Sequence, residues 1–585
     1  MRVILGINAY HADSSAAILV DGKLLAAAEE ERFRRIKHWA GFPEEAINYC
    51  LQAAGIGMHE VDVVALNSDP KANFGHKLAY LLTRKPSLAL ITDRFRSLGK
   101  RLGVEELLQQ MAGEKPFQAK LVRVEHHYAH LASAFYVSPF EKALTVSVDG
   151  FGDFSSTAWG MGDGAELSRD GSVLFPHSLG IFYQALTQYL GFPNYGDEYK
   201  VMGLAPYGEP RYLEQMEKIV RIQPDGTFKL DMRYFKHHKI RSVFSWEGGY
   251  PSVATLFNAQ PLEALLGPVR KKDEPLSQHH KDIARSIQAM YEKAFFALLN
   301  HLHGRYGTDH LTLAGGCAMN SVANGKVTRQ TPFKHLYIQS AAGDAGGAVG
   351  AAAAVWAEHA PQRAREPQMP HAYWGPSYDD DAIAQLLQER GDELQAADCQ
   401  VMQMSDDAER IDYVAKRIMN GEVIGWFQGA MEWGPRALGN RSILCDPRRS
   451  DMKDILNLKI KRRESFRPFA PAILRSEVSN WFELDDEVPF MMKVFPIRAE
   501  KRSEIPAVTH VDGSGRLQTV TAEQNRDYHD LIHRFGELTG VPILLNTSFN
   551  ENEPVVCQPV EALNCYLRTK MDCLVMGRWV VIRNG

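Results

Sequence analysis

The sequence predicts an α/β protein built from more than one domain. Its 585 residues exceed what one hydrophobic core usually serves, so about two to four domains are expected. Short apolar segments that suit strands alternate with longer segments that suit helices. A unit made of a strand, a polar turn and a hairpin also occurs twice in the N-terminal part, which suggests a duplicated subdomain.

The first of these units opens the chain. Residues 2–7 are predicted to form a strand and residues 8–13 a polar turn. Residues 16–20 and 23–28 are predicted to pair as a hairpin, because Asp21-Gly22 between them is a favoured two-residue turn.

The second unit repeats this order. Residues 144–148 suit a strand, 149–153 a glycine-rich turn and 155–161 a second strand. Ser14-Ser15-x-Ala17 matches Ser155-Ser156-x-Ala158, and each match lies a similar distance before an Asp-Gly turn. The two units resemble those of the actin and sugar-kinase type of ATPases, whose paired turns face each other across a phosphate-binding cleft. This resemblance implies an actin-like, duplicated ribonuclease-H-like domain.

Two histidines and two aspartates are candidate ligands of one metal ion. His126 and His130 are four residues apart in a predicted helix, so their imidazoles lie on the same helix face. Asp149 and Asp344 each close a strand into a glycine turn, where α/β folds bind ligands. Two nitrogen and two oxygen ligands without thiolate suit Fe(II), Mn(II) or Zn(II), and the sequence does not distinguish among them. The alternative is a pair of surface or core histidines without a metal.

A metal ion with open positions can polarise a carbonyl and lower the pKa of a hydroxyl group. His11, in the first polar turn, is a candidate general base or substrate hydrogen-bonding group if that turn faces the metal. A turn histidine without a catalytic role is the alternative.

A glycine pair follows the predicted strand at residues 311–314. Gly315 and Gly316 are expected to open a helix that includes Asn320, where phosphate oxygens can approach backbone N–H groups. Cys317 is interpreted as a small packing residue in this turn rather than a nucleophile, because no histidine or acid lies at a telling distance in sequence.

A domain boundary is predicted at residues 358–372, which contain three prolines and mixed charge. The expected first domain is residues 1–357, and the expected second domain is residues 373–585.

The second predicted domain contains cations next to glycine and proline. Arg436 and Arg441 follow an apolar strand expected at 422–427, and guanidinium groups bind phosphate oxygens bidentately. The run 459–463, taken alone, is typical of a solvated helix face. Together with a polar loop after a strand at 541–545, these cations would form a pocket for a polyanion, such as a nucleoside triphosphate beside a second phosphate. The candidate residues are Arg436, Arg441, Lys461, Arg463, Arg467, Asn546, Thr547 and Ser548.

Composition limits the partners of the protein. The formal net charge is -5, so neither nucleic acid nor an anionic membrane is expected as a partner. The 7 cysteines form no C-x-x-C pair and suit reduced thiols in a cytoplasm. The sequence shows no signal-peptide pattern, and its most apolar run, at 342–357, suits a packed helix rather than a membrane span. A soluble cytoplasmic protein is expected.

Several longer motifs occur in an order that a known family shares. They are Asn8 to Ala17, Glu29 to Phe33 with Lys37-His38, His126 to His130, Ser147 to Gly150, Gly315 to Asn320, Gly343-Asp344, Trp433 to Arg441, Lys461 to Pro471, His510 to Gln518 and Leu545 to Asn550. Through them the chain resembles the nodulation-type and antibiotic-tailoring O-carbamoyltransferases, of the tobramycin carbamoyltransferase type. The resemblance is weakest over 70–118 and 210–275.

The resemblance implies a two-step reaction. A C-terminal domain similar to the YrdC fold would form carbamoyl-adenylate from carbamoyl phosphate and ATP, with Mg as the cation of the nucleotide. The actin-like domain would then transfer the carbamoyl group to a hydroxyl of a small natural-product acceptor, with the help of an iron-type metal. By motif, the metal ligands would be His126, His130, Asp149 and Asp344, the catalytic residues His11 and Asp149, and the adenylate-holding turn Gly315, Gly316 and Asn320.

Two other functions remain open on the same sequence. One is a tRNA threonylcarbamoyl transferase, which the absence of excess basic charge disfavours. The other is an actin-like ATP-binding regulator without transfer chemistry. The sequence does not determine the acceptor, the native metal, the oligomeric state (a homodimer is one option) or the roles of 70–118 and 210–275.

Overall fold

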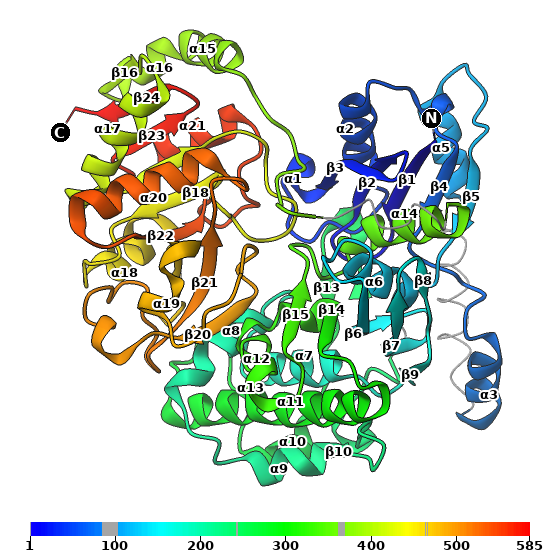
Figure 1. The fold of residues 1–585 in the computed structure, drawn as a ribbon. Coiled ribbons are helices and arrows are strands. Elements are labelled where there is room, and N and C mark those ends of the chain that lie inside the picture. The colour runs from blue at the N-terminus through cyan, green and yellow to red at the C-terminus, as the bar shows by residue number, and fades with distance from the viewer. Residues whose placement is uncertain are drawn as a thin grey trace. The chain divides into compact units, whose positions relative to one another are not determined.

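The computed structural model describes residues 2–84, 103–240, 244–360, 369–462, 464 and 466–584. The chain forms two compact units (Figure 1). Unit 1 comprises Met1–Asn320 and Lys326–Met369, and unit 2 comprises Ser321–Gly325 and Pro370–Gly585. Arg463 and the greater part of the predicted boundary segment lie outside the described residues.

The first sheet of unit 1 has the strand order β3-β2-β1-β4-β5. β1 pairs antiparallel with β2 and parallel with β4, and β2 pairs antiparallel with β3. The predicted N-terminal hairpin is therefore confirmed, with Asp21-Gly22 as its turn. The strands are β1 Val3–Asn8, β2 Ser15–Val20, β3 Lys23–Glu29, β4 Val63–Leu66 and β5 Lys120–Arg123.

The second sheet of unit 1 repeats this connectivity, because β6 pairs antiparallel with β7 and parallel with β14. The predicted turn at 149–153 is shorter than expected, since β6 continues through Gly152 with a register irregularity after Val148. Asp149 therefore lies within a strand. The strands are β6 Lys142–Gly152, β7 Ser155–Asp163, β8 Glu166–Leu167, β9 Gly171–Leu174, β14 His310–Ala314 and β15 His335–Ile338.

A buried helix, α14 (Gly346–His359), packs against both β1 and helix α6 (His126–Phe135). Glycines allow this approach: a Cβ on Gly350 would lie 1.9 Å from the carbonyl oxygen of Ala129 in α6. The predicted apolar helix is thus a core helix. The other longer helices of unit 1 are α2 Glu44–Ala54, α3 Phe74–Arg84, α5 Val104–Ala112, α7 Leu179–Tyr189, α10 Ala259–Leu266 and α11 Gln278–Tyr306.

Unit 2 is built on a nine-stranded mixed sheet with the order β16-β24-β23-β17-β18-β22-β19-β21-β20. Asn546 to Ser548, expected in a loop, belong to β22 because they pair with Leu444 to Ser442 of β18. The strands are β16 Cys399–Gln403, β17 Ile424–Phe427, β18 Arg441–Cys445, β19 Ala470–Leu474, β20 Lys493–Pro496, β21 Ser514–Val520, β22 Ile543–Ser548, β23 Cys573–Met576 and β24 Trp579–Arg583.

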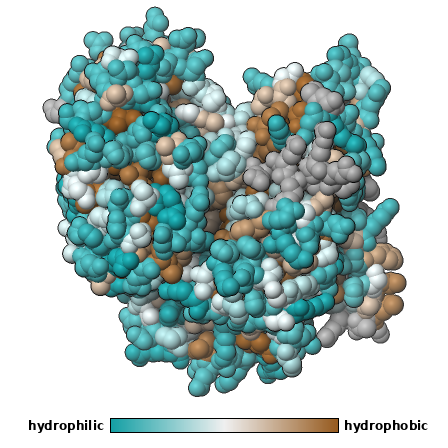
Figure 2. Space-filling view, in the orientation of Figure 1, coloured by the Kyte–Doolittle hydropathy of each residue, from teal (hydrophilic) through white to brown (hydrophobic). Residues whose placement is uncertain are grey.

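Helices pack against this sheet and enclose an apolar core that includes Trp426, Tyr528 and Phe535. The longer ones are α15 Asp380–Glu389, α17 Asp407–Met419, α20 Arg526–Thr539 and α21 Pro559–Arg568. The face of the molecule in Figure 2 is mostly hydrophilic, with apolar residues in small separate patches.

Candidate functional site

Helix α6 places the two candidate ligand histidines, His126 and His130, inside unit 1. The helix begins after Glu125, whose carboxylate accepts a hydrogen bond of 2.7 Å from the N–H of Tyr128. Asp153 accepts a second bond, of 3.0 Å, from the N–H of His126. The imidazoles of His126 and His130 are fully buried, and their Nε2 atoms are 3.0 Å apart.

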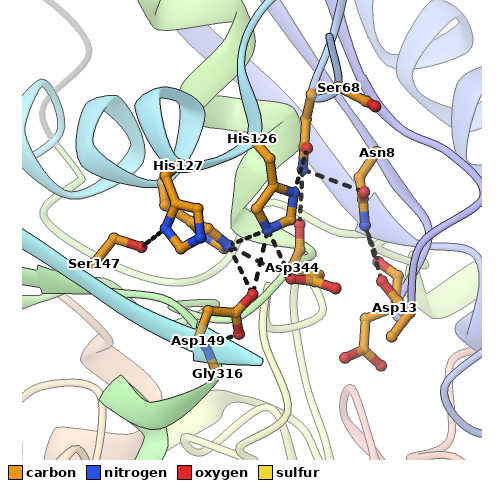
Figure 3. A network of polar contacts seen from close by, with 12 residues as sticks. Asn8, Asp13, Ser68, His126, His127, Ser147, Asp149, Gly316 and Asp344 are labelled. Carbon is orange, nitrogen blue, oxygen red and sulfur yellow. Dashed lines mark hydrogen bonds and ion pairs between the residues drawn. The ribbon is translucent and has the colours of Figure 1, made fainter. Parts of the chain in front are cut away.

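Two carboxylates meet this histidine pair, as Figure 3 shows. Oδ2 of Asp149, on β6, lies 3.2 Å from Nε2 of His126 and 3.7 Å from Nε2 of His130. Oδ1 of Asp344, in the turn before α14, lies 3.6 Å and 3.4 Å from the same two nitrogens. One ligand atom from each of the four residues thus lies within 4.8 Å of the others. The structure brings together all four candidates that the sequence named.

The four residues fit a divalent cation. Oδ1 of Asp344 is buried and accepts no hydrogen bond from the described residues. Burying a carboxylate oxygen in this way costs free energy unless a cation binds it. Burial raises the pKa of Asp344, and the neighbouring Asp149 carboxylate raises it further. Burial opposes protonation of His130, but Asp149 and Asp344 raise its pKa to about 9. A divalent ion would neutralise the two carboxylates, and the two-nitrogen, two-oxygen set suits a first-row metal.

Gly316 orients one of these carboxylates. Its N–H donates a hydrogen bond of 2.8 Å to Oδ1 of Asp149, which leaves Oδ2 directed at the histidines. The prediction that a helix opens at this glycine pair and includes Asn320 is wrong. Gly316–Met319 is only a short 3-10 turn, and Gly315 has a left-handed φ of 86°. Burial raises the pKa of the Cys317 thiol well above its usual range, which agrees with a packing role.

The resemblance places Asn320 in the adenylate-holding turn, and the structure pairs its side chain with another residue of unit 1. It exchanges hydrogen bonds of 3.0 and 3.1 Å with the amide of Gln288 on α11. Gly315, Gly316 and Asn320 therefore belong to one short segment that contacts Asp149 through Gly316.

The first polar turn faces the histidine pair. The ring centroid of His11 lies 4.9 Å from that of His126. A role for His11 at the site required that this turn face the candidate metal ligands, and it does. Tyr10 and Asp13 on either side have left-handed φ values of 59° and 52°. Asp13 also forms a 2.8 Å ion pair with Nδ1 of His38. His38 was not expected from composition or spacing, although it belongs to a motif of the resemblance.

Two cations of unit 2 are internal. Arg441 is fully buried at 0% exposure, and its guanidinium donates to the carbonyl oxygens of Gln428 (2.6 Å), Gly429 (3.2 Å) and Pro376 (3.0 Å). It also lies 3.7 Å from the ring centroid of Phe427. The side chain that the sequence suggested for phosphate is therefore surrounded by backbone.

Lys461 is likewise buried, at 1% exposure, in the π-helical segment Leu456–Lys461. Its ammonium donates to the carbonyl oxygen of Ser548 and to O and Oδ1 of Asn550, the latter two at 2.7 and 2.8 Å. The interpretation of this run as a solvated helix face is wrong for Lys461, because three distant oxygens replace its water shell.

Arg436 lies in a loop before β18, and Asn546 contacts that loop. The carboxylate of Glu432 accepts the N–H groups of Leu438 and Asn440, both at 2.8 Å, which fixes the loop that contains Arg436. Asn546 on β22 donates to the carbonyl oxygen of Ala437 at 3.0 Å. Partly exposed candidates are Arg436, Arg467, Thr547 and Ser548.

Comparison with known proteins gives these two units a class. The family profiles described as "Carbamoyltransferase N-terminus" and "Carbamoyltransferase C-terminus" match residues 3–353 and 415–583. The protein is thus a transferase that moves carbamoyl groups. It belongs to the carbamoyltransferase family that includes nodulation proteins of rhizobia.

Relatives match along almost the whole chain. Nodulation protein NolNO of Sinorhizobium fredii is 38% identical over 580 residues, covering 98% of this chain and 79% of its own. An uncharacterized protein of Synechocystis is 41% identical over 618 residues, covering 100% and 97%. A crystal structure of HypF from T. kodakarensis covers 62% of this chain and 48% of its own with 13% identity and a TM-score of 0.30, too low to support an inference. No helix among the described residues is long and apolar enough to cross a membrane.

Proposed function

We propose that the protein is an ATP-dependent O-carbamoyltransferase of a small-molecule hydroxyl acceptor. Unit 2, proposed to be YrdC-like, forms carbamoyl-adenylate from carbamoyl phosphate and Mg-ATP. Unit 1, proposed to be actin-like, transfers the carbamoyl group. The observation that supports the transfer step is the buried set of two histidines and two aspartates, in a chain of the carbamoyltransferase family.

The proposed first step is a displacement at phosphorus. Water releases phosphate from carbamoyl phosphate, a carbamate oxygen attacks the α-phosphorus of ATP, and the bond to pyrophosphate breaks. Such a step needs positioning and charge neutralisation more than a protein nucleophile. We assign contacts with the anions to Arg436, Arg467, Thr547 and Ser548. Asn546 is buried, and its amide donates to the carbonyl of Ala437 and the side chain of Gln518, so we assign it a supporting role. The buried Arg441 and Lys461 shape the backbone around them.

The metal site of the second step is proposed to consist of His126, His130, Asp149 and Asp344. Fe(II) is proposed, with Mn(II) or Zn(II) as alternatives that the same ligands accept. When bound, the ion supplies Lewis acidity that polarises a carbonyl oxygen and lowers the pKa of a hydroxyl. Gly316 keeps Asp149 directed at this site through its 2.8 Å hydrogen bond.

His11 is proposed to take the proton of the acceptor hydroxyl. Its ring lies 4.9 Å from the ring of His126, within reach of a substrate at the cluster. The hydroxyl oxygen attacks the carbamoyl carbon, the bond from that carbon to the phosphate oxygen of AMP breaks, and AMP leaves. The turn's hydrogen bonds hold His11 in place, since Ser14 Oγ donates to the His11 carbonyl at 3.2 Å.

The proposed function is tested by the products from ATP. Protein loaded with Fe(II) under anaerobic conditions is incubated with Mg-ATP, carbamoyl phosphate and a panel of hydroxylated metabolites. We expect AMP, pyrophosphate, and one panel member heavier by a carbamoyl group. Release of ADP alone would contradict the adenylate step. ATP turnover that ignores carbamoyl phosphate would favour a regulator without transfer chemistry.

A further inference from the structure

Two buried asparagines connect the histidine pair to the turn that contains His11. Asn8 is the last residue of β1 and is 0% exposed, and Asn67 directly follows β4 and is 2% exposed. Because β1 and β4 are parallel neighbours, their carboxyl ends meet at one edge of the sheet. Figure 3 shows Asn8 between Asp13 and the region of His126.

Backbone carbonyls fix which way the amide of Asn8 points. Its Nδ2 donates to the carbonyl oxygens of Ala12 at 2.9 Å and Asp13 at 3.0 Å. Carbonyl oxygens accept but never donate, so the amide nitrogen must face them. The oxygen of the Asn8 side chain therefore faces the other way, where it accepts from Nδ2 of Asn67 at 3.2 Å.

The same logic fixes Asn67. Its Nδ2 faces two acceptors, Oδ1 of Asn8 and, at 3.4 Å, the carbonyl oxygen of the metal-ligand candidate Asp344. The amide lies close against Gly347, where an added Cβ would be 1.7 Å from this nitrogen. Oδ1 of Asn67 is left directed at the imidazole of His126, 3.2 Å from Nδ1.

The last link concerns the tautomer of His126. An amide oxygen can only accept, so Nδ1 of His126 must donate the hydrogen of this bond. A neutral imidazole with this hydrogen on Nδ1 has its lone pair on Nε2, the atom that meets Asp344 and His130. Nε2 also lies 3.2 Å from Oδ2 of Asp149, which can only accept, so a cation bound at Nε2 is what leaves Nδ1 as the sole N–H of the ring. By contrast, Nδ1 of His130 has no hydrogen-bond partner among the described residues. His126 is thus the member of the pair with a fixed tautomer.

We propose that Asn8 and Asn67 form an amide relay that sets the tautomer of His126 and couples the His11 turn to metal binding. Both are positioning residues, and neither touches the reacting atoms. The proposal rests on the metal site of the proposed function. The relay adds that the backbone conformation of residues 12–13 influences the orientation of the proposed ligand His126 through the side chains of Asn8 and Asn67. Partners of this kind orient ligand histidines in metal sites generally.

The relay is tested by metal affinity and by the His126 tautomer together. Co(II) is titrated into the full-length apo-protein and followed by its visible absorption. Asn67→Leu, which keeps the number and branching of the side-chain heavy atoms but removes all three side-chain hydrogen bonds, is expected to weaken Co(II) binding by about 10- to 100-fold. Asn8→Ala is expected to weaken it too, although the structure gives Asn8 no hydrogen bond to His126. Gln188→Ala is the matched control, because this buried amide binds the carbonyl of Ala254 at 3.1 Å instead.

Nitrogen-15 NMR of histidine-labelled apo-protein gives the second readout. His126 of the wild type is expected to carry a hydrogen on Nδ1, whether or not Nε2 carries a second one against Asp149, and both relay variants are expected to lose the Nδ1 hydrogen. Unchanged Co(II) affinity and an unchanged tautomer in folded Asn67→Leu would overturn the relay. An effect of Asn67→Leu without any effect of Asn8→Ala would overturn its coupling to the turn. If wild-type protein binds no Co(II), the proposed metal site fails, and the tautomer still decides the relay.

Discussion

Substitution of Gly350 by alanine should disrupt the proposed metal site, although Gly350 is not one of its ligands. Gly350 lies in α14, and an added Cβ would be 1.9 Å from the carbonyl oxygen of Ala129 in α6. Ordinary contact begins at 3.4 Å, so the two helices must separate by about 1.5 Å. Helix α6 contains His126 and His130, whereas Asp344 immediately precedes α14. A metal site tolerates ligand displacements of only about 0.2 Å, so the separation should remove one side of the ligand set.

The measurements are a Co(II) titration and thermal unfolding of full-length protein. Gly350→Ala is expected to lose tight Co(II) binding and about 1–3 kcal/mol of stability from overpacking. Gly304→Ala is the matched control, because Gly304 lies in helix α11 and an added Cβ there meets nothing within 4 Å. This control should bind Co(II) normally and gain stability, since alanine is the better helix former. Normal Co(II) affinity in Gly350→Ala would refute the close-packing argument.

Three further outcomes are expected. Asp344→Asn should weaken Co(II) binding strongly in a titration, because the amide supplies no negative charge; unaltered affinity would remove Asp344 from the ligand set. Lys461→Met should lower the stability of the protein by about 1–3 kcal/mol in denaturant unfolding, because it removes the 2.7 Å donor to the carbonyl oxygen of Asn550 and leaves Oδ1 of Asn550 with only Ser548 Oγ as a donor. Burial opposes protonation of His38, but the Asp13 carboxylate raises its pKa from the usual 6.5 to about 9. A histidine whose pKa is raised on folding stabilises the folded protein fully at pH values below its unfolded pKa. The free energy of unfolding should therefore fall as pH rises from about 6.5 through 9, and Asp13→Asn should remove this fall.

The metal-ligand candidates could be predicted because each has a local sequence pattern. The four-residue spacing of His126 and His130 fixes a shared helix face, and glycine turns predicted after strands pointed to Asp149 and Asp344, although β6 continues through Asp149 to Gly152. Asn67 obeys the same strand-end rule, but an asparagine after a short strand is too common to single out. Its partners are 59 residues distant in sequence, at Asn8 and His126.

The environment of the cations could not be predicted for a related reason. Lys461 lies in a run of charged residues that suits a solvated face, and the oxygens that bind it are 87 and 89 residues further along the chain. Arg441 was expected to meet phosphate, yet its partners are carbonyls of a loop whose path depends on glycine conformations such as φ 43° at Gly429. Tertiary contacts of this range leave no local periodicity to read.

The short turn at Gly316 shows a different limit. A strand followed by two glycines commonly opens a helix, and the sequence predicted one here. The N–H of Gly316 instead binds Asp149, 167 residues earlier in the chain. A group expected to contact phosphate is therefore engaged with a metal-ligand candidate instead.

The most direct test of the two-step account compares His130→Ala with wild-type protein in a single assay. Both are given Mg-ATP, carbon-13-labelled carbamoyl phosphate and an acceptor found with the wild type, and pyrophosphate and labelled product are measured together. We predict that His130→Ala still releases pyrophosphate but forms no labelled carbamoyl ester. Formation of that ester by His130→Ala at the wild-type rate would contradict the assignment of transfer to the cluster in unit 1.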